Sequence, residues 1–313
     1  MDGLLVIDKP AGFTSHDVIA AARKILKERR LGHTGTLDPF ATGVLLVLVG
    51  RATRLAQFLS GSDKEYEAII RLGYATDTGD RTGTPIAGPH GTADPTRTGR
   101  WSEEEIDQAL ASLRGWIEQV PPMYSAKKIG GKKLYELARR GEEVTREPAR
   151  VCIHELAAIR PDGQLMKDNL DGTFDFHVRV VCSSGTYVRV LAEDFGKRLS
   201  VGAHLAELRR TRVGDFSVTS AVTLEQLKTS FGEEALGTIL LRPSAALSHL
   251  PFVHLSAEDV QRARHGMEVK VGETEWSEGE KVKMCDENNH LIAIGDYDAT
   301  TQRLHPSVVL ANV

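Results

Sequence analysis

Runs of apolar residues predict both strands and helices in the first part of the chain. The apolar run at residues 4–7 ends in a Pro- and Gly-containing turn, a pattern typical of a buried strand. Apolar positions at helical spacing over residues 18–26, with Ser15 as the expected cap, predict a helix. A polar loop over residues 32–43 then leads into the apolar run 44–49, which predicts a core strand.

Two longer segments show the period-two alternation of half-buried strands. In residues 66–72 the apolar side chains share one face, with Tyr66 at its inward edge, and residues 174–182 alternate in the same way. Helical spacing follows over residues 102–113 and 187–199. These segments together predict a mixed α and β protein.

The last part of the chain has a different character. Pro-containing dipeptides at residues 242–251 bracket an expected linker, and short strand-like pieces at 281–285 and 291–294 follow. We therefore predict two domains, one over residues 1–245 and a small all-β domain over residues 250–313.

Composition narrows the class of protein. The chain has 313 residues, of which 41% are hydrophobic and 26% charged, so it can bury a core and is not a disordered or repetitive chain. Three separated cysteines, at positions 152, 182 and 285, indicate neither a disulfide framework nor a four-ligand zinc site. No apolar run is long enough for a signal peptide or a membrane span, which predicts a cytoplasmic protein.

The charge distribution matters more than its total. A net charge of −4 argues against a nucleic-acid ligand, because phosphates bind through Lys and Arg. However, residues 251–313 contain 11 acidic and 6 basic residues, which leaves the rest of the chain close to neutral. Residues 127–150 hold eight basic and four acidic residues, and they are the most positive segment. The average charge therefore conceals a candidate nucleic-acid surface.

The polar loop at residues 32–43 contains the most suggestive chemistry. Its glycines allow tight backbone paths, and Pro39 biases Asp38 toward an extended conformation that projects its side chain. A carboxylate placed in this way can act as a nucleophile. Spacing alone favours the simpler interpretation, in which Asp38-Pro39 makes a turn and His33 bonds to a loop carbonyl.

This loop, GHTGTLDPFATG, resembles the signature GHTGxLDPxATG of the TruB-type tRNA pseudouridine synthases. Four further segments resemble the same family in the same order, and the resemblance covers about residues 3 to 215. They are KPAGFTS at 9–15, PPMYSA at 121–126 leading into GKKLY at 131–135, GTYVR at 185–189, and GAHL at 202–205 continuing to LRR at 208–210.

The resemblance implies a fold and an activity. The expected fold is α+β, with a mixed, largely antiparallel sheet and flanking helices (the pseudouridine synthase fold), followed by a small PUA-like RNA-binding β-barrel. The expected reaction converts uridine 55 in the T-arm loop of tRNA to pseudouridine, without a cofactor or metal. The expected partner is the T-arm stem-loop of tRNA. No membrane or obligatory protein partner is expected, and a monomer suffices for one stem-loop.

The resemblance also implies roles for single residues. Asp38 matches the family's nucleophile, and Arg189 matches the arginine that keeps this carboxylate ionised. Tyr66 matches the tyrosine on which a flipped base stacks, and Tyr187 a tyrosine that lines the base pocket. Leu208 matches a residue whose backbone reaches the uracil edge. We assign His33 to holding the opened T loop, whereas Lys9-Pro10 is interpreted as architectural.

Basic residues in two clusters are expected to grip RNA. The first lies in an insertion at about residues 122–150, where glycines 130 and 131 allow movement; the second follows the last motif. A solvated charged helix is the usual alternative for such a run. The expected RNA contacts are Lys127, Lys128, Lys132, Lys133, Arg209 and Arg210, with Arg139, Arg140, Arg146, Arg150 and Arg212 in the same clusters.

Two other functions remain open at this point. An RNA-binding or tRNA-folding protein would need the same surface, but it would not need Asp38, Tyr66 and Arg189 together. An aspartate-nucleophile glycosidase would ordinarily pair its nucleophile with a second carboxyl group. No second acid stands out in the motifs.

Overall fold

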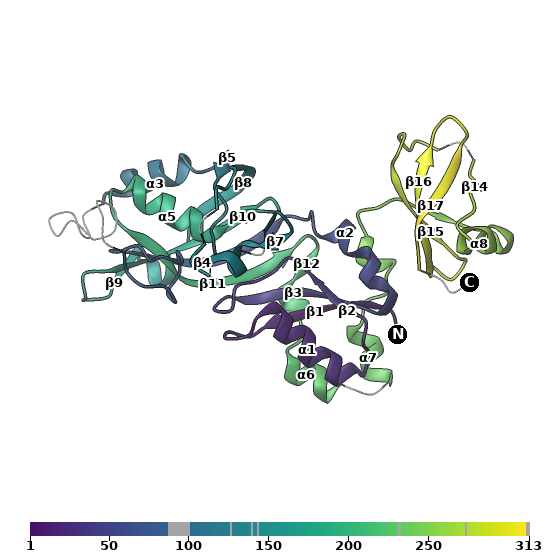
Figure 1. Ribbon diagram of the computed structural model, residues 1–313, viewed down its shortest axis with the longest axis horizontal. Helices are drawn as coiled ribbons and strands as arrows, with labels where there is room; N and C mark the ends of the chain where they lie inside the picture. Colours follow the sequence, from purple (N-terminus) through teal and green to yellow (C-terminus); the bar gives the residue numbers. More distant parts are fainter. Residues whose placement is uncertain are drawn as a thin grey trace.

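The structure is a computed structural model, and it describes residues 1–86, 101–125, 127–138, 140–142, 144–230, 233–272 and 274–310. A ten-stranded mixed sheet forms its main body (Figure 1). The neighbouring strands run in the order β1 (Gly3–Lys9), β3 (Thr42–Val49), β11 (Ala203–Val213), β4 (Lys64–Leu72), β10 (Phe174–Cys182), β8 (Ala149–Ala158) and β5 (Gly115–Gln119). Three short strands join this path: β2 (Leu31–Thr34) beside β3, β9 (Met166–Asp168) beside β10, and β12 (Phe216–Ser217) beside β11.

The sheet is largely antiparallel, as predicted. Among the strand pairs of this sheet, β3 and β11 run parallel and the others run antiparallel. The parallel pair joins two halves of the sheet. Each half carries its own helices, and their apolar side chains form separate buried clusters on the two sides of this junction.

Helices cover the two halves separately (Figure 1). Near β1 and β3 lie α1 (Ser15–Leu26), α6 (Leu224–Thr229) and α7 (Glu233–Ile239). Over β4, β10 and β8 lie α3 (Glu103–Ala111) and α5 (Val188–Arg198). The remaining short helices are α2 (Ala56–Leu59) and α4 (Leu134–Ala138), with 3₁₀ turns at Gly50–Leu55, Pro161–Gly163, Val218–Ser220 and Ala245–Leu247. Among the described residues, no helix is long and apolar enough to cross a membrane.

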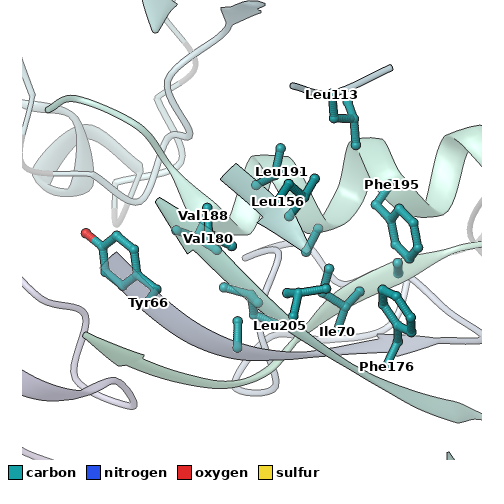
Figure 2. Packing of buried hydrophobic residues seen from close by; sticks show 14 of the residues in the cluster. Tyr66, Ile70, Leu113, Leu156, Phe176, Val180, Val188, Leu191, Phe195 and Leu205 are labelled. Atoms are coloured by element: carbon teal, nitrogen blue, oxygen red, sulfur yellow. The ribbon is translucent and has the colours of Figure 1, made fainter. Parts of the chain in front are cut away.

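Apolar side chains of α5 pack onto the strands beneath it (Figure 2). Phe195 stacks on Phe176 with 5.1 Å between ring centroids, and both side chains are fully buried. Tyr66 lies at one end of this core, and its hydroxyl points away from the apolar cluster. The core thus fixes the start of α5 and the start of β4 relative to each other.

The predicted strands and helices are present with bounds close to those expected, but the cap of α1 differs. Thr14, not Ser15, caps the helix: its Oγ1 accepts from the Asp17 N–H at 3.0 Å, and the Asp17 carboxylate bonds back to Thr14. Ser15 is buried, and its hydroxyl accepts from the Leu37 N–H at 3.0 Å. The prediction for Ser15 was therefore wrong, because this side chain supports the following loop.

Strand β11 was not predicted from the sequence, although it lies inside the sheet between β3 and β4. Its pairing with β4 shifts register between Leu205 and Glu207 and again between Arg210 and Arg212. These irregularities disturb the alternation that identifies a half-buried strand. Three charged residues in four positions, Glu207 to Arg210, conceal the strand further.

A second sheet forms the C-terminal part of the chain, and α8 (Ala257–Arg264) packs against it (Figure 1). Its strands run in the order β13 (Phe252–His254), β15 (Lys281–Cys285), β16 (Leu291–Asp298), β17 (Arg303–Val309) and β14 (Val269–Lys270). The predicted combination of a mixed sheet with a small C-terminal β-structure is confirmed. The division at residues 245 and 250 and the PUA-like class stay predictions.

The small sheet shares a core with the large one. Leu291, Ile294 and Leu310 belong to the same buried cluster as Leu4 and Leu46. Two arginines after β3 also donate hydrogen bonds to the C-terminal part of the chain. Arg51 donates to the Leu310 carbonyl at 2.6 Å, and Arg54 donates to the Val309 carbonyl at 2.5 Å.

Gly43 is required where β3 meets β11. Its φ is +102°, and a Cβ atom there would lie 2.1 Å from the Arg210 carbonyl oxygen, which cannot move without breaking the parallel pairing. The remaining β11 residue in this pairing, Arg209, lies opposite Thr42. A side chain at position 43 would therefore push the two halves of the sheet apart.

We expect Gly43→Ala to lower the free energy of unfolding by about 3 kcal/mol or more, because overpacking adds to a left-handed backbone. Gly12→Ala is the matched control, since Gly12 has φ +82° and open space around it, and it should cost about 1–2 kcal/mol. Urea unfolding followed by circular dichroism measures both. Equal losses in the two variants would contradict the importance of this close approach.

Candidate active site

A pocket of about 300 Å³ lies where the loop after β2, the start of β4, the middle of β11 and the start of α5 meet. It brings together most residues that the sequence predicted for the site. Its lining includes Asp38, Tyr66, Tyr187, Arg189 and Leu208, together with Lys64, Ser125, Lys127 and Arg210.

Asp38 and Arg189 form a two-point ion pair in this pocket. Arg189 Nε lies 2.9 Å from Asp38 Oδ2, and Nη2 donates to Oδ1 at 3.3 Å. The Arg189 side chain is 5% exposed and that of Asp38 is 30% exposed. The carboxylate therefore keeps an open side toward the pocket, while the guanidinium behind it is shielded from water.

Opposing effects set the protonation of Asp38. Burial raises the pKa of Asp38 above its ordinary value, because a carboxylate is poorly solvated there. The positive charge and hydrogen bond of Arg189 pull this pKa down, whereas the negative charge of Asp80 adds to the rise. Arg189 is thus the principal group that favours the ionised carboxylate.

The guanidinium of Arg189 is itself held from two further segments. Nη1 donates to the Thr78 carbonyl at 2.9 Å, and Nη2 donates to the Tyr124 carbonyl at 2.7 Å. Asp80 lies 3.9 Å from Nη1, and its carboxylate accepts from the Thr82 N–H and hydroxyl. Asp80 was not among the residues that the sequence predicted for the site, because it lies outside the segments that resemble the family.

Segments from the N-terminus support the loop that carries Asp38. Lys9 is fully buried, and its ammonium donates to the carbonyls of Phe13 at 2.7 Å and Pro39 at 3.3 Å. The Gly12 N–H also donates to the Pro39 carbonyl, at 2.8 Å. This placement beneath the loop agrees with an architectural role for Lys9.

Arg210 holds both ends of the same loop. Its side chain is fully buried; Nε donates to the Val44 carbonyl at 2.7 Å and Nη2 to the Gly35 carbonyl at 2.8 Å. The expected RNA contact does not fit this position, because a phosphate reaches only cations at the surface. Arg209 differs: its side chain is 40% exposed, lies outside the pocket lining, and pairs with Asp8 at 2.7 Å.

The aromatic and apolar residues expected around the base lie on three elements. Tyr66 is 7% exposed; burial raises the pKa of its hydroxyl, and the charge and hydrogen bond of Arg210 oppose that rise. Tyr187 directly precedes α5. Its N–H donates to Gln119 Oε1 at 2.9 Å, and Gln119 Nε2 donates to its carbonyl at 3.3 Å. Leu208 lies in β11 and lines the pocket.

His33 and most of the basic insertion lie outside the pocket lining. His33 is in β2, and its ring meets that of His16 edge-on at 5.4 Å between centroids. Lys128 and Lys132 are exposed on the hairpin of β6 (Lys128–Ile129) and β7 (Lys132–Lys133), and Lys133 belongs to the same hairpin. Arg139 falls outside the described residues.

Lys64 was missed, although a signal for it exists. It stands two positions before Tyr66 in β4 and therefore shares its face of the strand. It is 6% exposed and lines the pocket. Burial, reinforced by the nearby positive charge of Arg210, lowers the pKa of Lys64 to about 8.

The part of the chain that the structure describes contains no group of three or more His, Cys, Asp or Glu side chains placed to hold a metal ion. The chemistry available in the pocket is that of a carboxylate, two tyrosines and several cations. Such a set suits nucleophilic or proton-transfer chemistry on an aromatic base.

The neighbouring arginines of β11 provide a test of this geometry. We expect Arg210→Met to lower the free energy of unfolding by about 3 kcal/mol, because it removes the donor from the buried Val44 carbonyl and from the partly buried Gly35 carbonyl. Arg209→Met should cost less than about 1 kcal/mol, because it breaks only a partly exposed ion pair. Urea unfolding compares them, and a larger loss for Arg209→Met would refute the assignment.

Comparisons with known proteins agree with the site. The family model described as "TruB family pseudouridylate synthase (N terminal domain)" matches residues 23–188, and "tRNA pseudouridylate synthase B C-terminal domain" matches residues 189–247. A tRNA pseudouridine synthase B of Bacillus cytotoxicus is 40% identical over 100% of this chain and 98% of its own length. That of Symbiobacterium thermophilum is 48% identical over 85% of this chain and 83% of its own length.

A solved structure supports the same relationship. The Cbf5 complex with Nop10 and Gar1 contains a chain with a TM-score of 0.73 and 28% identity, and the match covers 99% of this chain and 85% of that one. The likeness therefore includes the C-terminal sheet as well as the large one. On the family models, the full-length relatives and this fold, the chain belongs to the TruB family of pseudouridine synthases.

Proposed function

We propose that the protein isomerises uridine 55 in the T-arm loop of tRNA to pseudouridine. The observation that carries the proposal is the ion pair of Asp38 with the shielded Arg189, in a pocket that Tyr66 and Tyr187 also line. The relatives' name, tRNA pseudouridine synthase B, and the loop signature at residues 32–43 support the same substrate class.

The reaction begins when the uridine leaves the base stack of the T loop and enters the pocket. Tyr66 offers a plane for the base, and Leu208 lies beside it on β11. Asp38 then starts the chemistry by attacking C1′, by adding to C6 or by removing the 2′ proton. Each route needs the ionised carboxylate, which Arg189 favours.

The overall reaction replaces the N1–C1′ bond with a C5–C1′ bond. The N1–C1′ bond breaks, the uracil rotates within the pocket, and C5 bonds to C1′. C5 then loses its proton to solvent and N1 takes one up, so the product has the same composition as the substrate. A site that holds the free base in place, without a cofactor, is sufficient for this exchange.

The exposure of the basic side chains supports the proposed RNA contacts. Lys127 lines the pocket, and Lys128 and Lys132 are exposed on the adjoining hairpin, which supports assigning them to RNA phosphates. We also propose Arg209 as an RNA contact and His33 as a residue that holds the opened T loop, and Lys133 stays an RNA contact proposed from the sequence. We further propose that the protein acts as a cytoplasmic monomer, with a catalytic domain at 1–245 and a PUA-like domain at 250–313.

The position of Asp80 favours an isomerase over a glycosidase. Asp80 is a second carboxylate beside Arg189, but it is 5% exposed and accepts bonds from Thr78 and Thr82. A group held in this way does not reach a leaving base as a general acid. A purely RNA-binding role, in turn, gives no reason to bury Arg189 against Asp38.

Tritium at C5 of the target uridine separates these functions. We expect the wild type to release tritium from a T-arm stem-loop, and Asp38→Asn to bind the RNA but release none, because the amide is not a nucleophile. Asp107→Asn on the exposed side of α3 is the control and should react normally. Absence of release by the wild type would refute the proposal, and free uracil would indicate hydrolysis.

The role of Arg189 predicts a change in pH dependence. Its charge lowers the pKa of Asp38, so Arg189→Gln should raise that pKa and move the acidic limb of the single-turnover pH–rate profile to higher pH. Arg189→Lys keeps the charge but loses the two-point contact, so we expect a slower reaction with a smaller shift. An unchanged acidic limb in Arg189→Gln would contradict the ion-pair role.

A further inference from the structure

Two buried cations form one wall of the pocket, and they do not belong to the Asp38–Arg189 pair. Lys64 is 6% exposed and Arg210 is 1% exposed, and both line the pocket beside Tyr66. They converge at Gly35: a Cβ atom there would lie 3.4 Å from Arg210 Nη1 and 3.7 Å from Lys64 Cε. The absence of a side chain at position 35 leaves room for both.

This wall has positive charge without a carboxylate to neutralise it. In the described parts of the chain, neither Lys64 nor Arg210 takes part in an ion pair. Carbonyl dipoles hold them instead. Lys64 donates to the carbonyls of Ser60 at 3.0 Å and Ser62 at 2.5 Å, and Arg210 donates to those of Gly35 and Val44.

Such an arrangement suits an anion that forms inside the pocket. Buried cations oriented by fixed dipoles need no rearrangement when negative charge develops beside them, and their effect is stronger where water is excluded. An ammonium group has three donors, and carbonyls take two of those of Lys64. Among the described residues no third acceptor is bonded to it, so one donor remains for a bound group.

The chemistry of the proposed reaction identifies that anion. In the proposed function the RNA phosphates contact the exposed lysines, whereas the base enters the pocket that Tyr66 lines. When the N1–C1′ bond breaks heterolytically, its electron pair remains on N1. The released uracil is then a monoanion whose charge spreads over N1, O2 and O4. The charge disappears when an electron pair of the base forms the C5–C1′ bond; C5 then loses its proton and N1 gains one.

We propose that Lys64 is a further catalytic residue, whose ammonium, backed by Arg210, stabilises the uracil anion between cleavage of the N1–C1′ bond and formation of the C5–C1′ bond. This proposal rests on the proposed function. A purely structural alternative exists, in which Lys64 only anchors the turn at residues 60–62 between α2 and β4. The two differ in how the rate responds to the stability of the departing base.

The test compares uridine with 5-fluorouridine in the same T-arm stem-loop, under single-turnover conditions. Fluorine stabilises the uracil anion, so the fluorinated base needs less help from the protein. Uridine is followed by tritium release, and 5-fluorouridine by loss of the parent nucleoside after nuclease digestion and chromatography. Wild type, Lys64→Met, Lys64→Arg and the exposed control Lys228→Met are compared.

We expect Lys64→Met to react about 100-fold more slowly on uridine, with RNA affinity unchanged. On 5-fluorouridine the deficit should shrink to about tenfold, which is the effect of roughly one pKa unit in the leaving base. Lys64→Arg keeps the charge and should recover most of the rate. Lys228→Met should match the wild type on both substrates.

Equal deficits of Lys64→Met on the two bases, or a rate close to that of the wild type, would overturn the proposal. Thermal melting of each variant identifies a folding defect, and the ratio of the two substrates is insensitive to the fraction folded. If the wild type releases no tritium, the proposed function fails. If the wild type reacts but the substrate dependence is absent, only the role of Lys64 fails.

Discussion

The ion pair between Asp38 and Arg189 is the constraint on which the rest of the site depends. A partly buried carboxylate is ionised only if a cation lies beside it, and a buried guanidinium is tolerated only if all sides are satisfied. Arg189 meets this condition through Thr78, Tyr124 and Asp38, which come from three separate segments. The three segments are therefore held together by their contacts with the guanidinium of Arg189.

The loop that carries Asp38 is likewise held by a few buried side chains. Lys9 holds its Pro39 carbonyl from below, and Arg210 holds Gly35 and Val44 at its two ends. Both cations are satisfied by backbone carbonyls, so they support the loop without competing for the carboxylate of Asp38. The site therefore separates the positive charges that shape the loop from the one that pairs with the carboxylate.

The sequence predicted the regular parts of the fold and the motif residues of the pocket, and the physical reasons for its failures are specific. Alternation identified β4 and β10, but β11 escaped because its register shifts and its charges hide the strand. Arg209 and Arg210 are adjacent residues of the same type in β11. Because successive side chains of a strand point to opposite faces, that of Arg209 is partly exposed and that of Arg210 is buried. Asp80 contributes through a turn whose partner, Arg189, is 109 residues away in sequence, a proximity that no local pattern encodes.

The parallel pairing of β3 with β11 has a consequence for the timing of synthesis. Arg209 pairs with Thr42 across 167 positions of sequence, and Arg210 closes the loop across an even longer interval. At ordinary translation rates the ribosome makes β11 about 10–30 s after β3. During that interval Arg210 does not yet close the loop that carries Asp38, and Arg189 follows Asp38 by 151 positions, so the nascent chain lacks a complete site. Activity begins only after most of the large sheet exists.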